Sequence, residues 1–117
     1  YFVLFLIFIF DKQGGQSEDL EIGKFPLGGG SNLNELMSIS LEHRGEFKIF
    51  YGAFLSKNER TLKIPNGTGQ VFSYCLDGCF EVAQRMLFSG DGLSLSGFQE
   101  FDIECLSNKG LIILFVL

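Results

Sequence analysis

Gln70–Ser96, QVFSYCLDGCFEVAQRMLFSGDGLSLS, is the stretch of the chain that decides the fold. Two apolar runs, Val71–Leu76 and Cys79–Val82, flank the dipeptide Asp77-Gly78. An Asp-Gly pair between such runs is a strong short-range signal for a two-residue β-hairpin, because glycine adopts a positive φ without steric cost. We therefore predict two antiparallel strands here, with a second turn at Gly90-Asp91-Gly92 and another strand after it.

The composition is that of an all-β domain. The 117 residues are enough to bury a core without disulfides, and 15 Gly with only 2 Pro suit short strands joined by glycine-bearing turns. The net charge is −5 and the 9 basic residues are scattered, whereas binding to a nucleic-acid backbone needs a basic stripe. We expect one domain over residues 1–117 and no nucleic-acid partner.

The cysteines are Cys75, Cys79 and Cys105. An odd number without framework spacing favours reduced thiols in a cytosolic protein. In the expected hairpin, Leu76 pairs with Cys79 and Cys75 pairs with Phe80, so the Cys75 and Cys79 side chains point to opposite faces. We therefore expect buried free thiols rather than a disulfide, and a cytoplasmic location.

Residues Tyr1–Phe10, YFVLFLIFIF, form an unbroken apolar run. A transmembrane helix needs about 20 such residues. A signal peptide needs a basic segment before its apolar core and small residues after it, which Asp11-Lys12-Gln13 does not supply. We expect a leading strand that is buried on both faces, with one face free to pack on another domain or subunit, and no membrane partner.

Residues 11–45 are predicted to be rich in loops. Gly28-Gly29-Gly30-Ser31 lacks the Gly-Lys-Ser/Thr of a phosphate-binding loop, so it indicates a flexible connector, natural or engineered. Leu20-Glu21-Ile22 fits a short strand, and Asn32–Ser40 fits one helical turn with a capping residue. The single histidine, His43, is expected to be a solvated loop residue.

Residues 46–117 alternate between apolar runs and turns. Glu46–Leu55 is predicted to be a strand with a bulge at Gly52, and Pro65-Asn66-Gly67 a turn. Further strands are expected at Glu59–Ile64, Arg85–Phe88, Leu93–Leu95, Phe101–Leu106 and Leu111–Leu117. The tally of about eight to nine short strands with essentially no helix predicts a sandwich or barrel, and jelly rolls and cupins are one such class.

Few side chains suit catalysis or metal binding. One histidine cannot build a facial triad, and the cysteines fall in strand patterns that keep a thiol inaccessible. Asp102 and Glu104 share one face of a strand, an arrangement compatible with acid–base work, but we interpret them as the polar side of a half-buried strand. We predict no catalytic, cofactor-binding or metal-ligating residues and no cofactor on this chain.

Several segments match one family pattern. They are a Gly-x-Phe-Glu-Val type motif within Asp77–Val82, Gly-Asp-x-Leu-x-Leu at Gly90–Leu95, the strand end Glu104–Ser107 and the apolar strand Leu111–Leu117. Over Glu46–Leu117 the chain thus resembles the C-terminal cupin domain of pirin-like, quercetin 2,3-dioxygenase-type bicupins. Tyr51–Phe54 with Glu59 resembles the strand that enters this cupin, and Tyr1–Phe10 the strand that passes between the two halves.

The resemblance implies a cupin-like (RmlC-like) double-stranded β-helix, or jelly-roll, barrel. Catalytic cupins hold a metal on a His-x-His-plus-Glu pattern with a further His. This chain has Asn58–Leu62 and Ser96–Phe98 in those places, and Glu59 alone matches a ligand type. The resemblance therefore implies a non-catalytic domain with a structural or interaction role, packing against another cupin domain or a second copy of itself as an oligomer.

Two alternatives stay open. In the first, the chain is part of a quercetin 2,3-dioxygenase-like enzyme whose metal site lies in a missing N-terminal cupin. In the second, the chain is a small-molecule binding module that uses the barrel mouth.

Overall fold

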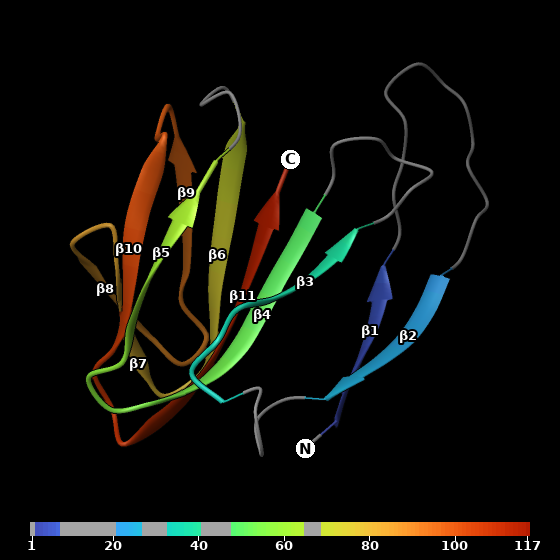
Figure 1. Cartoon of the computed structure of the whole chain (residues 1–117), viewed down its shortest axis with the longest axis horizontal. Coiled ribbons are helices and arrows are strands. Elements are labelled where there is room, and N and C mark those ends of the chain that lie inside the picture. The colour runs from blue at the N-terminus through green and yellow to red at the C-terminus, as the bar shows by residue number, and fades with distance from the viewer. Residues whose placement is uncertain (1, 8–20, 27–32, 41–47, 65–68) are drawn as a thin grey trace.

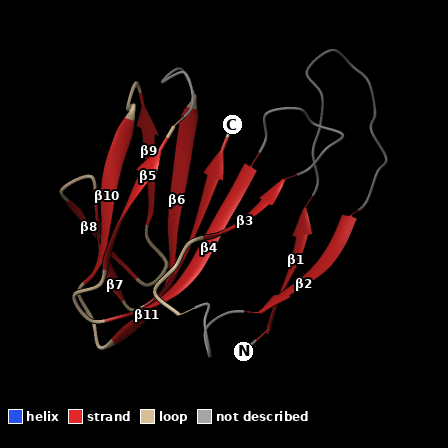
Figure 2. Cartoon of the chain, viewed as in Figure 1, coloured by secondary structure: helices blue, strands red, loops and turns tan. Residues whose placement is uncertain are grey.

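The computed structural model describes residues 2–7, 21–26, 33–40, 48–64 and 69–117, and within these ranges it contains strands and turns but no helix (Figures 1 and 2). The described strands are β1 (Phe2–Ile7), β2 (Glu21–Pro26), β3 (Met37–Ser40), β4 (Lys48–Leu55), β5 (Glu59–Lys63), β6 (Gln70–Asp77), β7 (Cys79–Val82), β8 (Arg85–Phe88), β9 (Gly92–Ser96), β10 (Glu100–Cys105) and β11 (Lys109–Val116).

Nine of these strands form two antiparallel sheets that face each other. One sheet has the order β3-β4-β11-β6-β9 and the other β5-β10-β7-β8. From β4 to β11 the chain passes from one sheet to the other at every connection except the one between β7 and β8. This repeated crossing is the winding of a jelly roll, so the predicted all-β, cupin-like barrel is confirmed. β1 and β2 pair only with each other, as a separate two-stranded sheet.

The core lies between the two facing sheets. Side chains alternate between the faces of a strand, so every second residue of the long strands points inward. Phe54 of β4 and Phe80 of β7 meet edge to face at 5.9 Å between ring centroids. Around them the fully buried apolar side chains are Val71, Val82, Ile103, Ile112 and Leu114. Burial of each such side chain contributes roughly 1.5–3 kcal/mol, so this apolar cluster is a major source of the barrel's stability.

The predicted hairpin at Asp77-Gly78 is wrong. β6 pairs with β11 and β9, whereas β7 pairs with β10 and β8, so Leu76 and Cys79 are not partners. Asp-Gly signals a tight reversal of the chain, but it does not determine whether the two strands stay in one sheet. Here the dipeptide is a corner between sheets. The positive φ expected of Gly78 is present, at 84°.

Hydrogen bonds hold this corner against its neighbours. The Gly78 N–H donates to the Ser89 hydroxyl and the Cys79 N–H donates to the Ser107 hydroxyl, both at 2.9 Å. A Cβ on Gly78 would lie 2.5 Å from Ser107 Oγ and 2.6 Å from the carbonyl oxygen of Lys109. The corner therefore needs glycine for close packing as well as for its backbone conformation.

The actual hairpin of this region joins β7 to β8. Val82 pairs with Arg85 across the turn residues Ala83 and Gln84, whose φ angles are 48° and 65°. Two successive positive φ values are typical of a type I′ turn, which favours Asn and Gly. Ala and Gln give no such signal, and this turn could not be read from the sequence. Its conformation stores strain, since a side chain with Cβ disfavours the left-handed region.

Two expectations near the start of the barrel are also wrong. The predicted helical turn over Asn32–Ser40 is, in its described part, a turn at residues 33–35 followed by β3. Asn34, with φ 65°, uses its side-chain oxygen to accept the Leu55 N–H at 2.7 Å, so it ties this turn to β4 instead of capping a helix.

The predicted bulge at Gly52 is absent, because β4 keeps one register with both β3 and β11. A Cβ on Gly52 would lie 2.6 Å from the Glu35 carbonyl oxygen, so this glycine permits a close approach of the backbone. The register irregularity of this sheet lies elsewhere, between Leu111 and Ile112 against β6.

The N-terminal predictions are confirmed in part. β1 confirms a strand within Tyr1–Phe10, and β2 confirms the short strand predicted at residues 20–22 from Glu21 onward. The prediction of one domain over residues 1–117 stays a prediction. His43, the glycine run at residues 28–31 and the turn at residues 65–67 lie outside the described residues.

One buried polar atom gives a stability prediction. Ser73 of β6 is fully buried, and its hydroxyl has no hydrogen-bond partner among the residues that the structure describes. A buried polar group without a partner costs about 1–3 kcal/mol. We expect Ser73→Ala to raise the free energy of unfolding, measured by urea denaturation, by about 1 kcal/mol. Ser94→Ala, at an exposed position of β9, is the control and should change nothing. A loss of stability in Ser73→Ala would contradict the prediction.

Candidate functional site

The barrel interior does not offer the ligand set of a catalytic cupin. Of the residues at the implied ligand places, Glu59 is exposed, Leu62 is a buried apolar residue and Phe98 is half-buried. Within the part of the chain that the structure describes, no three His, Cys, Asp or Glu side chains form a group able to hold a metal. Since His43 lies outside that part, the absence of a metal site stays a prediction.

The three cysteines are all free. Cys75 and Cys105 are fully buried, as expected, whereas Cys79 is only half-buried. Burial raises the pKa of the Cys75 thiol to about 11 and also raises that of Cys105. The thiolate is the nucleophilic form, so both buried groups act as small apolar side chains with weak S–H donors. Cys105 Sγ lies 3.4 Å from the Ser107 carbonyl oxygen.

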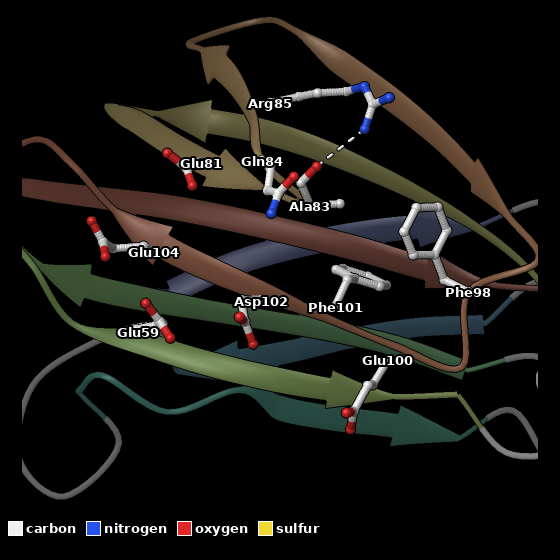
Figure 3. A pocket seen from close by; sticks show the side chains of 10 residues that line it. All are labelled: Glu59, Glu81, Ala83, Gln84, Arg85, Phe98, Glu100, Phe101, Asp102 and Glu104. Atoms are coloured by element: carbon white, nitrogen blue, oxygen red, sulfur yellow. Dashed lines mark hydrogen bonds between the residues drawn. The ribbon is translucent and has the colours of Figure 1, made fainter.

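The candidate site is a groove of about 420 Å³ on the outward side of the four-stranded sheet (Figure 3). Strands β5, β7 and β10 supply its carboxylates, the β7–β8 turn supplies one end, and the β9–β10 connection adds an aromatic side chain. Its lining residues are Glu59, Glu81, Ala83, Gln84, Arg85, Phe98, Glu100, Phe101, Asp102 and Glu104.

Strand register places three glutamates of the groove in one row. Glu104 of β10 pairs with Glu59 of β5 on one side and with Glu81 of β7 on the other. Like charges directly opposite each other destabilise a sheet. The pKa of Glu59 is raised, first by the negative charge of Asp102 and then by desolvation, Glu104 and Glu81. The Asp102 carboxylate in turn accepts a hydrogen bond from the Thr61 hydroxyl at 2.7 Å.

The end of the groove away from the glutamate row contains two aromatic rings and the strained β7–β8 turn. Phe98 and Phe101 meet edge to face at 6.1 Å between ring centroids. The Arg85 guanidinium donates to the Ala83 carbonyl oxygen at 3.1 Å, the contact drawn as a dashed line in Figure 3. Carboxylates beside aromatic rings favour cations over anions.

The predicted role of Asp102 and Glu104 is consistent with their positions. Asp102 is exposed and Glu104 half-buried, and they alternate with the buried Phe101, Ile103 and Cys105. They are thus the polar side of a half-buried strand. Sequence reasoning did not find the groove, because strands far apart in the sequence build it. The sequence did place Glu59, Glu81 and Glu104 each in a predicted strand, but it did not show that these strands are neighbours.

The acidic row gives a prediction about pH. A carboxyl group whose pKa is raised on folding binds its proton more tightly in the folded state, so stability falls as pH rises through the interval between the unfolded and folded pKa values. The raised pKa of Glu59 thus makes its ionised form destabilising at neutral pH. We expect Glu59→Gln to raise Tm at pH 7 and to reduce the fall in Tm between mildly acidic and neutral pH.

The matched control for this prediction is Glu100→Gln. Glu100 lies on the same groove but pairs across the strands with Lys63, an opposite charge. Its neutralisation should leave Tm unchanged or lower it. Thermal unfolding at several pH values and two salt concentrations measures both variants, and the effect of Glu59→Gln should shrink at high salt. Equal behaviour of the two variants would contradict the assignment.

Comparison with known proteins finds similarity only at the level of structure. No protein-family model matches the sequence, and no curated protein matches it. No helix of the described residues is long and apolar enough to cross a membrane.

Several solved structures are similar to this one. YhhW from Escherichia coli superposes with a TM-score of 0.67 at 13% identity, over 85% of this chain and 44% of that chain. The same bacterial pirin in complex with nickel(II) gives a TM-score of 0.66 at 15% identity. The cupin domain of an XRE-family transcriptional regulator from Enterobacter cloacae gives 0.59 at 11% identity, over 69% of this chain and 94% of that chain.

This chain spans less than half the length of YhhW but most of the single cupin domain from Enterobacter cloacae. At these identities the similarity concerns the fold alone. With its two facing sheets and repeated crossings, the chain has the cupin fold.

Proposed function

We propose that the chain is a non-catalytic cupin domain, of the kind found as the C-terminal half of pirin-like proteins, that works in the cytosol by packing against another cupin domain or a second copy of itself. The observation that carries the proposal is the filled interior. Phe54 and Phe80 meet in the middle of the barrel, with Ile103, Ile112 and Leu114 around them. A close-packed apolar interior suits a scaffold, since catalysis in a barrel needs convergent polar groups and room for substrate.

Among the described residues, the edge of the four-stranded sheet offers a place where such packing could begin. β8 is an edge strand of the four-stranded sheet, and its Met86 and Phe88 side chains are each 56% exposed. An edge strand with exposed apolar side chains is a template for pairing with another chain. Association through β8 would cover both the apolar side chains and the unpaired strand edge.

Sedimentation velocity over a range of concentrations tests the proposal. We expect the parent chain to self-associate reversibly and Phe88→Lys to weaken that association, while Ser94→Lys, on an exposed position of the other sheet, leaves it unchanged. A parent chain that stays monomeric at every concentration, and that also fails to bind a second cupin domain, would overturn the proposal.

The groove favours a second candidate, a small-molecule binding module. Its volume of about 420 Å³ lies within the range of ligand pockets, roughly 300–1,000 Å³. It lies on the outward side of a sheet rather than in the barrel mouth expected from the sequence. Thermal-shift screening with cationic and aromatic compounds tests this function, because a ligand at 100 times its Kd stabilises by about 2.7 kcal/mol. A hit whose shift persists in Glu59→Gln and Asp102→Asn would place binding elsewhere.

A further inference from the structure

The outward face of the five-stranded sheet is apolar and covered. Ile49 and Tyr51 of β4 and Ile113 of β11 point away from the barrel core, since they alternate with the core residues Phe50, Ile112 and Leu114. Their exposed fractions are nevertheless 0%, 3% and 3%. An antiparallel sheet that faces solvent carries polar residues on that face. Another layer must therefore cover these three side chains.

The cover ends partway across the sheet. Ile49, Phe115, Phe72 and Ser94 are register partners in one row across β4, β11, β6 and β9. Along this row Ile49 is fully buried, Phe115 is half-buried, Phe72 is 41% exposed and Ser94 is exposed. The row also changes from apolar to polar at β9. The covering layer thus lies over β4 and the adjoining part of β11.

The segment on that side is the hairpin β1–β2. Figure 1 shows both strands beyond β3 and β4, on the side of the five-stranded sheet opposite to the four-stranded sheet. A two-stranded sheet is at best marginally stable alone and needs a surface to pack against. β1 reads FVLFLI and has no polar residue. The hairpin needs a support, and the sheet face needs a cover.

We infer that hairpin β1–β2 is a displaceable strap that docks on the outward face of the five-stranded sheet and hides an apolar interaction surface formed by Met37, Ile39, Ile49, Tyr51, Leu111, Ile113 and Phe115. The barrel then stays folded without the hairpin, and the loss of the strap exposes a face on which a second copy of this chain docks. This inference does not depend on the proposed function, which concerns the filled interior and the edge strand β8.

Hydrogen exchange followed by mass spectrometry on the full chain tests the inference. Ile49→Lys places a charge in the covered part of the row, and Phe72→Lys places the same charge in its uncovered part. We expect amides of residues 2–7 and 21–26 to exchange about tenfold faster or more in Ile49→Lys, with β10 still protected. Phe72→Lys should keep the hairpin protected. Equal hairpin protection in the two variants and the parent chain would overturn the inference.

A second variant decides the matter if Ile49→Lys does not fold. The double substitution Gly23→Pro and Lys24→Pro changes no residue of the barrel and is designed to disrupt the hairpin. In an antiparallel ladder, the N–H groups of adjacent residues point alternately toward the partner strand and away from it. One of the two prolines therefore removes an N–H that donates to β1. We expect this variant to stay folded, to bind an apolar dye several-fold more strongly than the parent and to self-associate. A hairpin lost without any rise in dye binding would overturn the inference.

Discussion

Gly78→Ala is expected to lower the free energy of unfolding by about 2–5 kcal/mol, because it combines two costs at one corner. The φ of Gly78 is 84°, where a residue with Cβ loses about 1–2 kcal/mol. The added methyl would also lie 2.6 Å from the Lys109 carbonyl oxygen and 2.9 Å from the Gly110 Cα. Both are backbone atoms, so β11 itself must move to relieve the contact, and overpacking of this kind costs about 1–3 kcal/mol.

Gly90→Ala is the matched control. Gly90 also has a positive φ, 90°, but a Cβ there meets nothing within 4 Å. Its substitution should cost only the backbone part, about 1–2 kcal/mol. Urea denaturation of both variants gives the difference, which isolates the packing of the corner. An equal loss of unfolding free energy in the two variants would show that Gly78 is required for its φ alone and that the close contact with β11 does not affect stability.

Phe80→Ala is expected to cost about 3–5 kcal/mol, the range for removal of a fully buried aromatic side chain. The Phe80 ring packs against Phe54 at one edge and lies over Gly110, where an added Cβ would be 2.6 Å from its Cε2. Phe80 thus joins β7 to both β4 and β11 across the barrel. The cavity left by alanine would open between the two sheets, where neither can collapse without breaking its register.

Phe88→Ala is the control for Phe80→Ala. Phe88 lies on the edge strand β8, where it pairs with Cys79 of β7, and its side chain is 56% exposed. The loss should therefore be within about 0.5 kcal/mol. Thermal unfolding measured on the monomer compares the two variants. A Phe80→Ala variant as stable as Phe88→Ala would mean that the interior is loosely packed and open to a ligand, contrary to the proposed function.

Sequence reasoning predicted the strands better than their partners. Alternation of apolar and polar residues located β4, β5 and β10 to within a few residues, and apolar runs located β6 and β11, because both patterns are local properties of a strand. The sheet to which a strand belongs is a tertiary property. Asp77-Gly78 has the composition of a hairpin turn, yet the burial of Phe80 against Phe54 needs β7 in the opposite sheet.

The turn at Ala83-Gln84 shows the opposite error. It has the backbone of a tight hairpin without a residue that favours it, and the pairing of β7 with β8 imposes the conformation. The groove beside it was missed for a related reason. Glu59, Glu81 and Glu104 are scattered through the sequence and meet only through the registers of three strands. The local sequence pattern of a strand does not determine which residues of other strands it pairs with.

The filled interior is tested most directly by metal binding to the purified chain. Equilibrium dialysis against Fe(II), Mn(II) and Ni(II), followed by metal analysis, measures the bound equivalents. Since apolar side chains fill the described barrel interior and Glu59 alone matches a ligand type at the implied ligand places, we expect far less than one equivalent of each ion. One equivalent that is retained after further dialysis against buffer, with a gain in Tm, would contradict a non-catalytic cupin domain.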